Sequence, residues 1–159
     1  MKKVNEFVWP LRVYYEDTDA AGVVYHANYL KFMERARTEW LRELGFEQTQ
    51  LKQQYHLIFL VRHLSIDYLK PALFNDLLHI NTHITQLGKV RMTMAQQVLR
   101  ESDILCTARV KIAAVNANNQ RPQAIPPDIL NVLKNENSIE ALAKPQVSPG
   151  AIHVQPLRG

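Results

Sequence analysis

Apolar side chains recur every three or four positions along residues 28–44, which read NYLKFMERARTEWLREL. This spacing places them in one stripe on an α-helix of about 25 Å. Asn28 suits the N-cap position, and Gly45 suits the residue that follows the helix. The segment predicts one long amphipathic helix, with a stripe formed by Tyr29, Leu30, Met33, Ala36 or Arg37, Trp40, Leu41 and Leu44.

Five further segments are rich in β-branched and aromatic residues or alternate between apolar and polar positions, which indicates strands. They cover residues 7–15, 56–70, 76–87, 90–100 and 104–115, and Pro10 favours a sheet edge or a bulge for the first of them. The order predicts that the last four strands form a meander, and one long helix is available to cover one face of the sheet. We therefore expect an α+β protein with the hot-dog fold, in which a curled five-stranded antiparallel sheet wraps around the long helix.

The chain changes character after the last predicted strand. Residues 116–122 have a loop-like composition, and residues 126–135 (PPDILNVLKN) suit a short helix with proline in its first turn. From residue 136 onward, Pro145, Pro149, Gly150 and Pro156 occur without periodicity. These features predict one hot-dog domain over residues 1–135 and a mobile tail over residues 136–159.

Charge and composition narrow the choice of function. The net charge is +4 with no long basic run, which argues against nucleic-acid binding. It suits an anionic small molecule, a phosphopantetheine carrier or peripheral association with an anionic inner membrane, although ordinary surface charge explains it equally well. No apolar run is long enough to span a membrane, and no secretory signal is apparent. Cys106 is the only cysteine, so we expect a cytoplasmic protein without an internal disulfide.

The densest chemistry lies in residues 14–37, which read YYEDTDAAGVVYHANYLKFMERAR. Glu16, Asp17 and Asp19 stand between a predicted strand and the helix, and Gly22 permits a tight turn. A helix N-terminus presents unpaired N–H groups that polarise a thioester carbonyl, and a nearby carboxylate can attack that carbonyl or activate a water. Acidic residues at such positions are more often helix caps, so these residues alone do not decide the function.

The complete string resembles the 4-hydroxybenzoyl-CoA thioesterase family. Residues 17–22 carry its D-x-D-x-x-G element, and an aromatic residue, an N-Y pair and E-R-A-R follow at Tyr25, residues 28–29 and residues 34–37. The Y-H-A-N-Y version is most similar to the YbgC-type branch, thioesterases associated with the bacterial Tol–Pal system. R-P-x-x-I-P at residues 121–126 is similar to the end of that domain. The resemblance covers about residues 10–133.

The resemblance implies hydrolysis of acyl-CoA to a carboxylate and CoA, without a metal or an organic cofactor. Asp19 matches the catalytic aspartate of the family, and the His26 backbone N–H matches the oxyanion donor. The family forms dimers with the active site between subunits, often paired into tetramers, and binds the CoA phosphates near the third and fourth strands. Lys89 and Arg91 lie at that hairpin. We also expect Tyr25 and Asn28 to border the substrate.

Several alternatives remain open on the sequence. Asp19 could act as a general base or as a nucleophile, and acyl carrier protein could replace CoA as the carrier. A hot-dog protein that binds acyl carriers in an envelope assembly without turnover is a second function, whereas the acidic loop argues against a hydratase. The residues do not determine three properties: the acyl group, the choice between dimer and tetramer, and the role of the tail.

Other polar residues have simpler interpretations. Asp17 is expected to be structural, in a turn or in a salt bridge with Arg12 or Arg35. His79 and His83 would lie about 13 Å apart on a strand, too far to share a metal. Residues 63, 65 and 67 (His, Ser and Asp) suit a polar wall facing a partner subunit rather than a catalytic triad.

Overall fold

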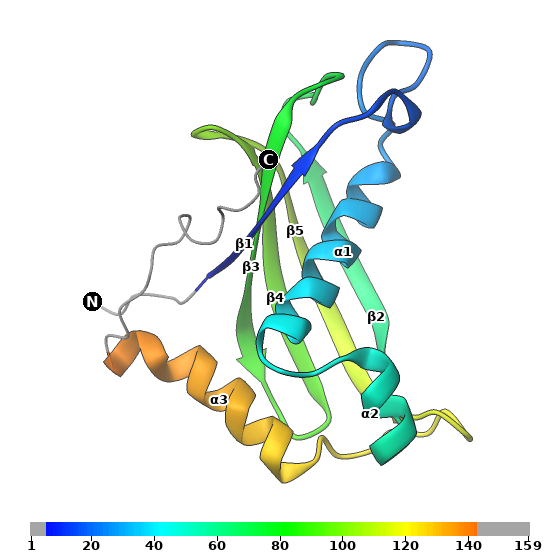
Figure 1. Ribbon diagram of the computed structural model, residues 1–159, viewed down its shortest axis with the longest axis vertical. Helices are drawn as coiled ribbons and strands as arrows, with labels where there is room; N and C mark the ends of the chain where they lie inside the picture. The colour runs from blue at the N-terminus through cyan, green and yellow to red at the C-terminus, as the bar shows by residue number, and fades with distance from the viewer. Residues whose placement is uncertain (1–5, 143–159) are drawn as a thin grey trace.

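The computed structural model describes residues 6–142, with side chains described to residue 135. Figure 1 shows a long curved sheet with helix α1 lying across one of its faces. The elements are β1 (Phe7–Arg12), the 3₁₀ turn η1 (Tyr15–Asp17), α1 (Asn28–Glu43), α2 (Gln48–Tyr55), β2 (Leu57–Tyr68), β3 (Leu77–Leu87), β4 (Arg91–Arg100), β5 (Asp103–Asn116) and α3 (Pro127–Leu142).

The sheet has five strands in the order β1-β3-β4-β5-β2, and all neighbouring strands are antiparallel. This is the predicted hot-dog architecture. The expected meander of the last four strands is wrong, because only β3, β4 and β5 follow one another in the sheet. Strand β2 instead pairs with β5 at the far edge, so β1 and β2 are the two edge strands.

Helix α1 supplies the apolar stripe predicted for it. Phe32, Met33 and Ala36 are fully buried, and they pack with residues of β3, β4 and β5 such as Ile80 and Val98. The strands alternate accordingly, with buried residues toward the helix and partly exposed residues on the outer face. Burial of this shared face is the main source of the fold's stability.

Two further differences concern the helices. Helix α2 was not predicted, because its sequence QTQLKQQY has a single buried residue, Leu51. Helix α3 begins close to the predicted start but continues to Leu142, beyond the predicted end at residue 135. Ile129 and Leu133 anchor it to the second core cluster, together with residues of α1, β4 and β5. Residues 143–159 of the predicted tail lie outside the described residues.

Strand β2 is a long edge strand with an irregularity at its centre. Its register with β5 shifts between Val61 and His63, so Arg62 has no direct partner and forms a bulge. Leu60 and Val61 are among the exposed large apolar residues. An exposed edge of this length is a template for pairing with another strand.

Candidate active site

A loop between β1 and α1, here called the acidic loop (residues 13–27), carries the predicted chemistry. The buried Asp17 organises it: its carboxylate accepts hydrogen bonds from the Tyr14 backbone N–H and the Asn28 side-chain amide, both at 2.9 Å. Its carbonyl accepts the Tyr25 N–H at 2.8 Å. Asp17 is therefore a structural residue of the loop, but the expected salt bridge with Arg12 or Arg35 is wrong.

Asp19 occupies a different environment, although it lies only two residues further on. Its side chain is exposed, and one carboxylate oxygen accepts the Ala21 N–H at 2.9 Å. Its backbone closes a tight turn through bonds to Val23 and Gly22. Gly22 has φ +85, a conformation that L side chains rarely adopt, which explains the glycine at this position. The loop thus holds Asp19 by its backbone and presents the carboxylate to solvent.

The start of α1 follows from a second turn. Asn28 donates its N–H to the Tyr25 carbonyl at 2.8 Å, and Ala27 is the N-cap. The Tyr25 carbonyl therefore points toward the helix. Since a trans peptide directs its C=O and N–H in opposite directions, the N–H of His26 points away from the helix. This orientation suits a donor to an external oxyanion.

Aromatic residues surround this turn. The Tyr68 hydroxyl donates to the His26 carbonyl at 2.8 Å, and the His26 ring contacts the rings of Tyr25 and Tyr68. Burial raises the pKa of Tyr68, so its hydroxyl remains a donor. Tyr25 and Asn28 were predicted to border the substrate. Tyr25 is exposed, whereas Asn28 is buried and its side-chain amide donates to Asp17.

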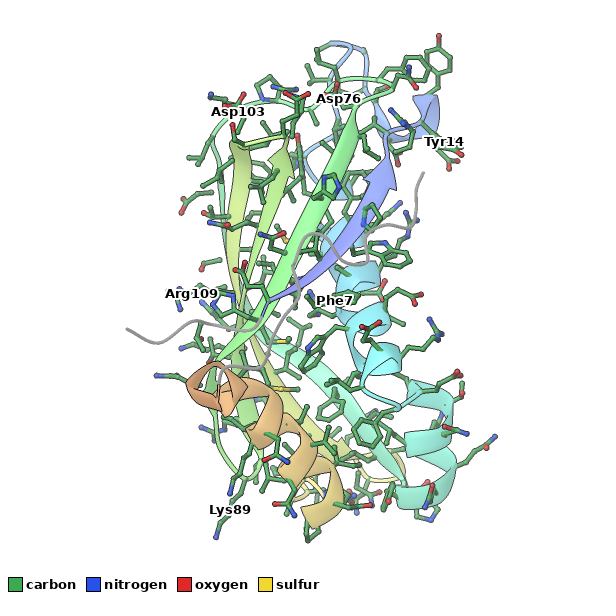
Figure 2. The ribbon with its side chains drawn as sticks, turned by 60° about the vertical axis from the view of Figure 1, so that its left-hand side comes forward. Phe7, Tyr14, Asp76, Lys89, Asp103 and Arg109 are labelled. Atoms are coloured by element: carbon green, nitrogen blue, oxygen red, sulfur yellow. The ribbon has the colours of Figure 1, made fainter. Side chains whose placement is uncertain are left out.

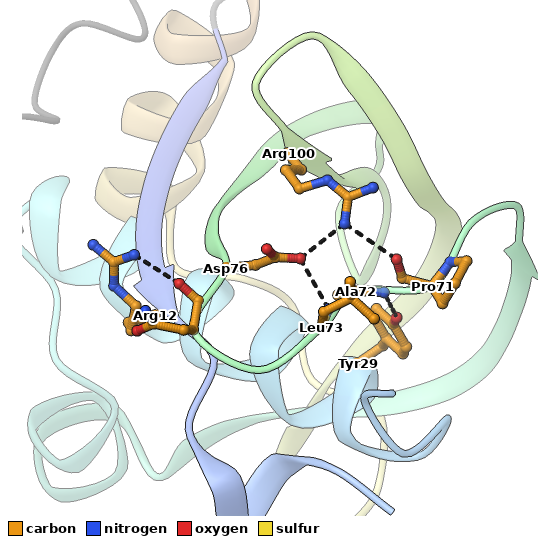
Figure 3. Close-up of polar contacts among 8 residues, drawn as sticks. Arg12, Tyr29, Pro71, Ala72, Leu73, Asp76 and Arg100 are labelled. Atoms are coloured by element: carbon orange, nitrogen blue, oxygen red, sulfur yellow. Dashed lines mark hydrogen bonds and ion pairs between the residues drawn. The ribbon is translucent and has the colours of Figure 1, made fainter. Parts of the chain in front are cut away.

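A second loop, residues 69–76, braces the acidic loop (Figure 3). Arg100 donates to Asp76 at 2.8 Å and to the Pro71 carbonyl at 3.3 Å, while Asp76 also accepts the Leu73 N–H. The Ala72 carbonyl accepts the Val24 N–H at 2.9 Å, and the Ala72 N–H donates to the Tyr29 hydroxyl at 3.0 Å. The ion pair of Arg100 and Asp76 thus supports the backbone that positions Asp19. Sequence reasoning missed this pair, whose members are far apart in the chain.

The two cations predicted to bind the CoA phosphates, Lys89 and Arg91, lie away from the acidic loop. Figure 2 shows Lys89 at one end of the long axis and Tyr14 at the other. Arg91 lines a surface groove of about 840 Å³, here called the basic groove, whereas Lys89 is exposed at the hairpin beside it. Two cations that the sequence did not indicate, Arg62 of the β2 bulge and Lys111 of β5, also line this groove.

The remaining nucleophiles and metal ligands do not form a second centre. Burial raises the pKa of the Cys106 thiol to about 12, so the thiol stays protonated. Within the described part of the chain, no three His, Cys, Asp or Glu side chains are placed to hold a metal ion. No helix among residues 6–142 is long and apolar enough to cross a membrane.

Comparison with known proteins agrees with this geometry. Residues 13–133 match the family model of the thioesterase-like superfamily. The chain belongs to this superfamily. Its relatives include the acyl-CoA thioesterase YbgC of Haemophilus influenzae, 45% identical over 125 residues that cover 79% of this chain and 92% of the relative. The acyl-CoA thioester hydrolase YbgC of Escherichia coli O6:H1 is 42% identical over 129 residues, 80% of this chain and 96% of the relative.

Solved structures support both the family and the fold. A probable thioesterase from Bartonella henselae superimposes with a TM-score of 0.74 at 42% identity, covering 76% of this chain and 99% of that one. A DHNA-CoA thioesterase from Staphylococcus aureus has a TM-score of 0.81 at 19% identity, covering 89% of this chain and 97% of that one, which indicates a shared fold. The predicted resemblance to hot-dog thioesterases of the YbgC type is therefore confirmed.

Proposed function

We propose that this protein hydrolyses acyl-CoA thioesters, with Asp19 as the catalytic carboxylate and the His26 backbone N–H as the oxyanion donor. The observation that carries the proposal is the contrast between two acids of one loop. Asp17 is buried and hydrogen-bonded twice, whereas Asp19 is held by its backbone with an exposed carboxylate. The similarity to proteins named acyl-CoA thioesterase supports the choice of reaction.

The reaction needs a nucleophile and a site for the developing negative charge. With Asp19 as general base, the carboxylate takes a proton from a water molecule, and the water oxygen attacks the thioester carbonyl carbon. The His26 N–H and the start of α1 stabilise the oxyanion. The C–S bond then breaks, and the thiolate of CoA takes the proton from Asp19. Alternatively, the Asp19 carboxylate attacks the carbonyl carbon directly, the C–S bond breaks and the CoA thiolate takes a proton from solvent. Water then hydrolyses the resulting mixed anhydride to the free acid and the Asp19 carboxylate.

CoA itself gives a role to the basic groove. Its pyrophosphate and 3′-phosphate carry several negative charges, and Arg62, Arg91 and Lys111 line one groove. Guanidinium groups bind phosphate oxygens in bidentate geometry, and an ammonium group adds a point charge. We assign this groove to the phosphates of CoA or of the phosphopantetheine of an acyl carrier protein, with Lys89 as an outer contact.

Lys89, beside the groove, and Tyr14 of the acidic loop lie at opposite ends of one subunit, so one subunit alone does not bring the groove and the loop together (Figure 2). Pairing of two β2 strands about a two-fold axis removes this difficulty, because the strands then run antiparallel. The acidic loop of one subunit would lie near the groove of its partner. A homodimer, either alone or paired into a tetramer, is therefore part of the proposal. A cytoplasmic location and a link to the Tol–Pal system stay predictions drawn from the resemblance.

The test is hydrolysis of acyl-CoA substrates from acetyl-CoA to palmitoyl-CoA, measured through the release of free thiol. Asp19→Asn should lower kcat by roughly 10²–10⁴-fold, since the amide neither accepts a proton nor attacks. Glu16→Gln is the matched control, because Glu16 is an exposed acid of the same loop. Tight binding of acyl-CoA without hydrolysis would favour the non-catalytic carrier-binding function instead. An Asp19→Asn variant with undiminished kcat would exclude the assigned mechanism.

A further inference from the structure

A small pocket lies beneath α1, next to the free edge of β2. Its volume is about 140 Å³, and we call it the α1 pocket. This is close to the size of an engineered protein cavity that binds benzene, or about five methylene groups of an acyl chain. Its apolar wall comes from α1 and three strands and includes Trp40, Phe59, Val61, Met92 and Met94.

One side of the α1 pocket is polar because Arg37 lies there. The Arg37 guanidinium donates to the side-chain oxygen of Gln96 at 3.0 Å. Gln96 is almost fully buried, and its amide donates to the Met33 carbonyl at 3.0 Å and to the Thr82 hydroxyl at 2.9 Å. Since both donors of the amide are used, its oxygen must face Arg37. This bond holds one nitrogen of the guanidinium at the pocket wall.

The charge of Arg37 is not neutralised by a direct ion pair. Among the residues with described side chains, Arg37 takes part in none of the ion pairs. Burial lowers its pKa, and the charge of Glu34 partly opposes this change. Glu34 and Thr38 also line the pocket, and the Thr38 hydroxyl donates to Glu34 at 3.4 Å. An arginine remains protonated in such a setting, so the N–H groups of Arg37 that are not bonded to Gln96 can donate to a bound acceptor.

The lining contains one cation and one carboxylate, which selects the chemistry of the occupant. A ligand carboxylate would meet the repulsion of Glu34, and a methyl group would offer Arg37 no acceptor beyond the oxygen of Gln96. A hydroxyl group fits both, because its oxygen accepts from Arg37 while its hydrogen can be donated to Glu34 or Thr38. The pocket therefore suits an uncharged chain or ring that ends in a hydroxyl.

The position of the pocket relates it to the catalytic loop of a second copy. Phe59 lines the pocket near one end of β2 and Val61 lines it close to the centre, whereas Tyr68 at the other end donates to the His26 carbonyl. When two β2 strands pair antiparallel about an axis near their centre, Tyr68 of one copy lies opposite the Phe59 end of the other. The pocket of one subunit then opens toward the acidic loop of its partner.

We propose that the α1 pocket receives the distal end of the acyl group bound at the partner subunit's acidic loop, and that Arg37 selects acyl groups with a hydroxyl at that end. This inference rests on the proposed thioesterase function. It names the class of acyl group. It also makes Arg37 of one subunit a specificity residue for the reaction at Asp19 of the other subunit.

The test compares 6-hydroxyhexanoyl-CoA with heptanoyl-CoA, which differ by a hydroxyl in place of a methyl. The wild-type protein should prefer the hydroxylated substrate in kcat/KM by roughly tenfold or more, as expected for a hydrogen bond to a charged group. Arg37→Met should remove this ratio, and Arg37→Lys, which keeps a charged donor, should retain part of it. Arg35→Met is the control, because Arg35 is exposed on the same helix.

Thermal unfolding of each variant separates loss of the ratio from loss of the fold. An unchanged ratio in Arg37→Met, or equal turnover of the two substrates by the wild-type protein, would overturn the pocket assignment alone. Failure of the wild-type protein to hydrolyse these two substrates, when it hydrolyses others of the panel from acetyl-CoA to palmitoyl-CoA, would also overturn the pocket assignment alone, whereas failure on the whole panel would overturn the proposed function together with it.

Mixed dimers test the arrangement across subunits. One chain carries Asp19→Asn and the other carries Arg37→Met, and two affinity tags isolate the heterodimer. Its one functional Asp19 then faces a pocket with Arg37 intact, so the preference for the hydroxylated substrate should return. If the heterodimer shows the ratio of the Arg37→Met homodimer, the pocket serves its own subunit and the arrangement across the dimer is wrong.

Discussion

The Asn28 side-chain amide donates to Asp17 at 2.9 Å, which joins the 3₁₀ turn of the acidic loop to the first residue of α1. Both side chains are buried. This bond fixes how the loop enters the helix, and therefore where the side chain of Asp19 lies. The two acids of the D-x-D element thus have different environments: Asp17 holds the loop, and Asp19 presents its carboxylate to solvent.

Asp17→Asn should lower the free energy of unfolding by about 1–3 kcal/mol, the usual cost of a lost buried hydrogen bond that leaves a polar group unpaired. The new amide can still accept from Tyr14, but its other group faces the Asn28 amide as donor to donor. Urea unfolding measures the loss. The double variant Asp17→Asn with Asn28→Asp restores a donor–acceptor pair and should recover more than half of it. No recovery would show that the two side chains do not stabilise the loop together.

The contrast between these acids explains what the sequence could predict about the site. The spacing of D-x-D-x-x-G and the start of the helix indicated the loop and its chemistry, because turn and helix-start signals are local. The partner of Asp17 was not predictable in the same way. A charge suggests an ion pair, but burial of Asp17 favoured an amide and a backbone N–H whose positions depend on the loop.

Arg91→Met combined with Arg62→Met should raise KM for acyl-CoA by roughly 5–50-fold and change kcat much less, because phosphate contacts bind the ground state and the transition state alike. The increase should shrink at higher salt, which screens charges beyond about 8–10 Å. Lys89→Met should have a smaller effect, since Lys89 lies outside the groove lining. Steady-state kinetics at two salt concentrations decides the matter. Equal KM values for the double variant and the wild-type protein at low salt would exclude the groove as the phosphate site.

The protein should sediment as a dimer or larger at micromolar concentration, because the exposed edge of β2 carries Leu60 and Val61. Leu60→Lys should shift it toward monomer and lower its activity, since it places a charge in the apolar strand edge that pairing of the two subunits would bury. Ile104→Lys is a matched control, because Ile104 is exposed to a similar degree, 36% against 37% for Leu60, but lies on β5. A fully active monomer in the wild-type protein would contradict a site shared between subunits.

The sheet shows where prediction from periodicity stops. Alternation found all five strands within a few residues, since each strand has one face against the core. It did not find the strand order, because pairing of β2 with β5 depends on contacts across the whole chain. The α1 pocket was missed for the same reason. Arg37 stood in the helix stripe as an alternative to Ala36, and its bond to Gln96 spans 59 residues.

Stability should fall as the pH drops from 7.5 to 5, in part through His79 of β3. Burial lowers the pKa of His79 in the folded protein, because it disfavours the imidazolium. The unfolded chain has the ordinary histidine pKa of about 6.5, so it binds more protons than the folded chain between the two pKa values. The contribution of neutral His79 is therefore complete above pH 6.5 and is lost as the pH falls toward the folded pKa.

His79→Gln removes this titration but keeps a neutral polar side chain, so the variant should lose less stability than the wild-type protein. Urea unfolding at both pH values measures this difference, and equal losses would show that His79 does not couple folding to pH.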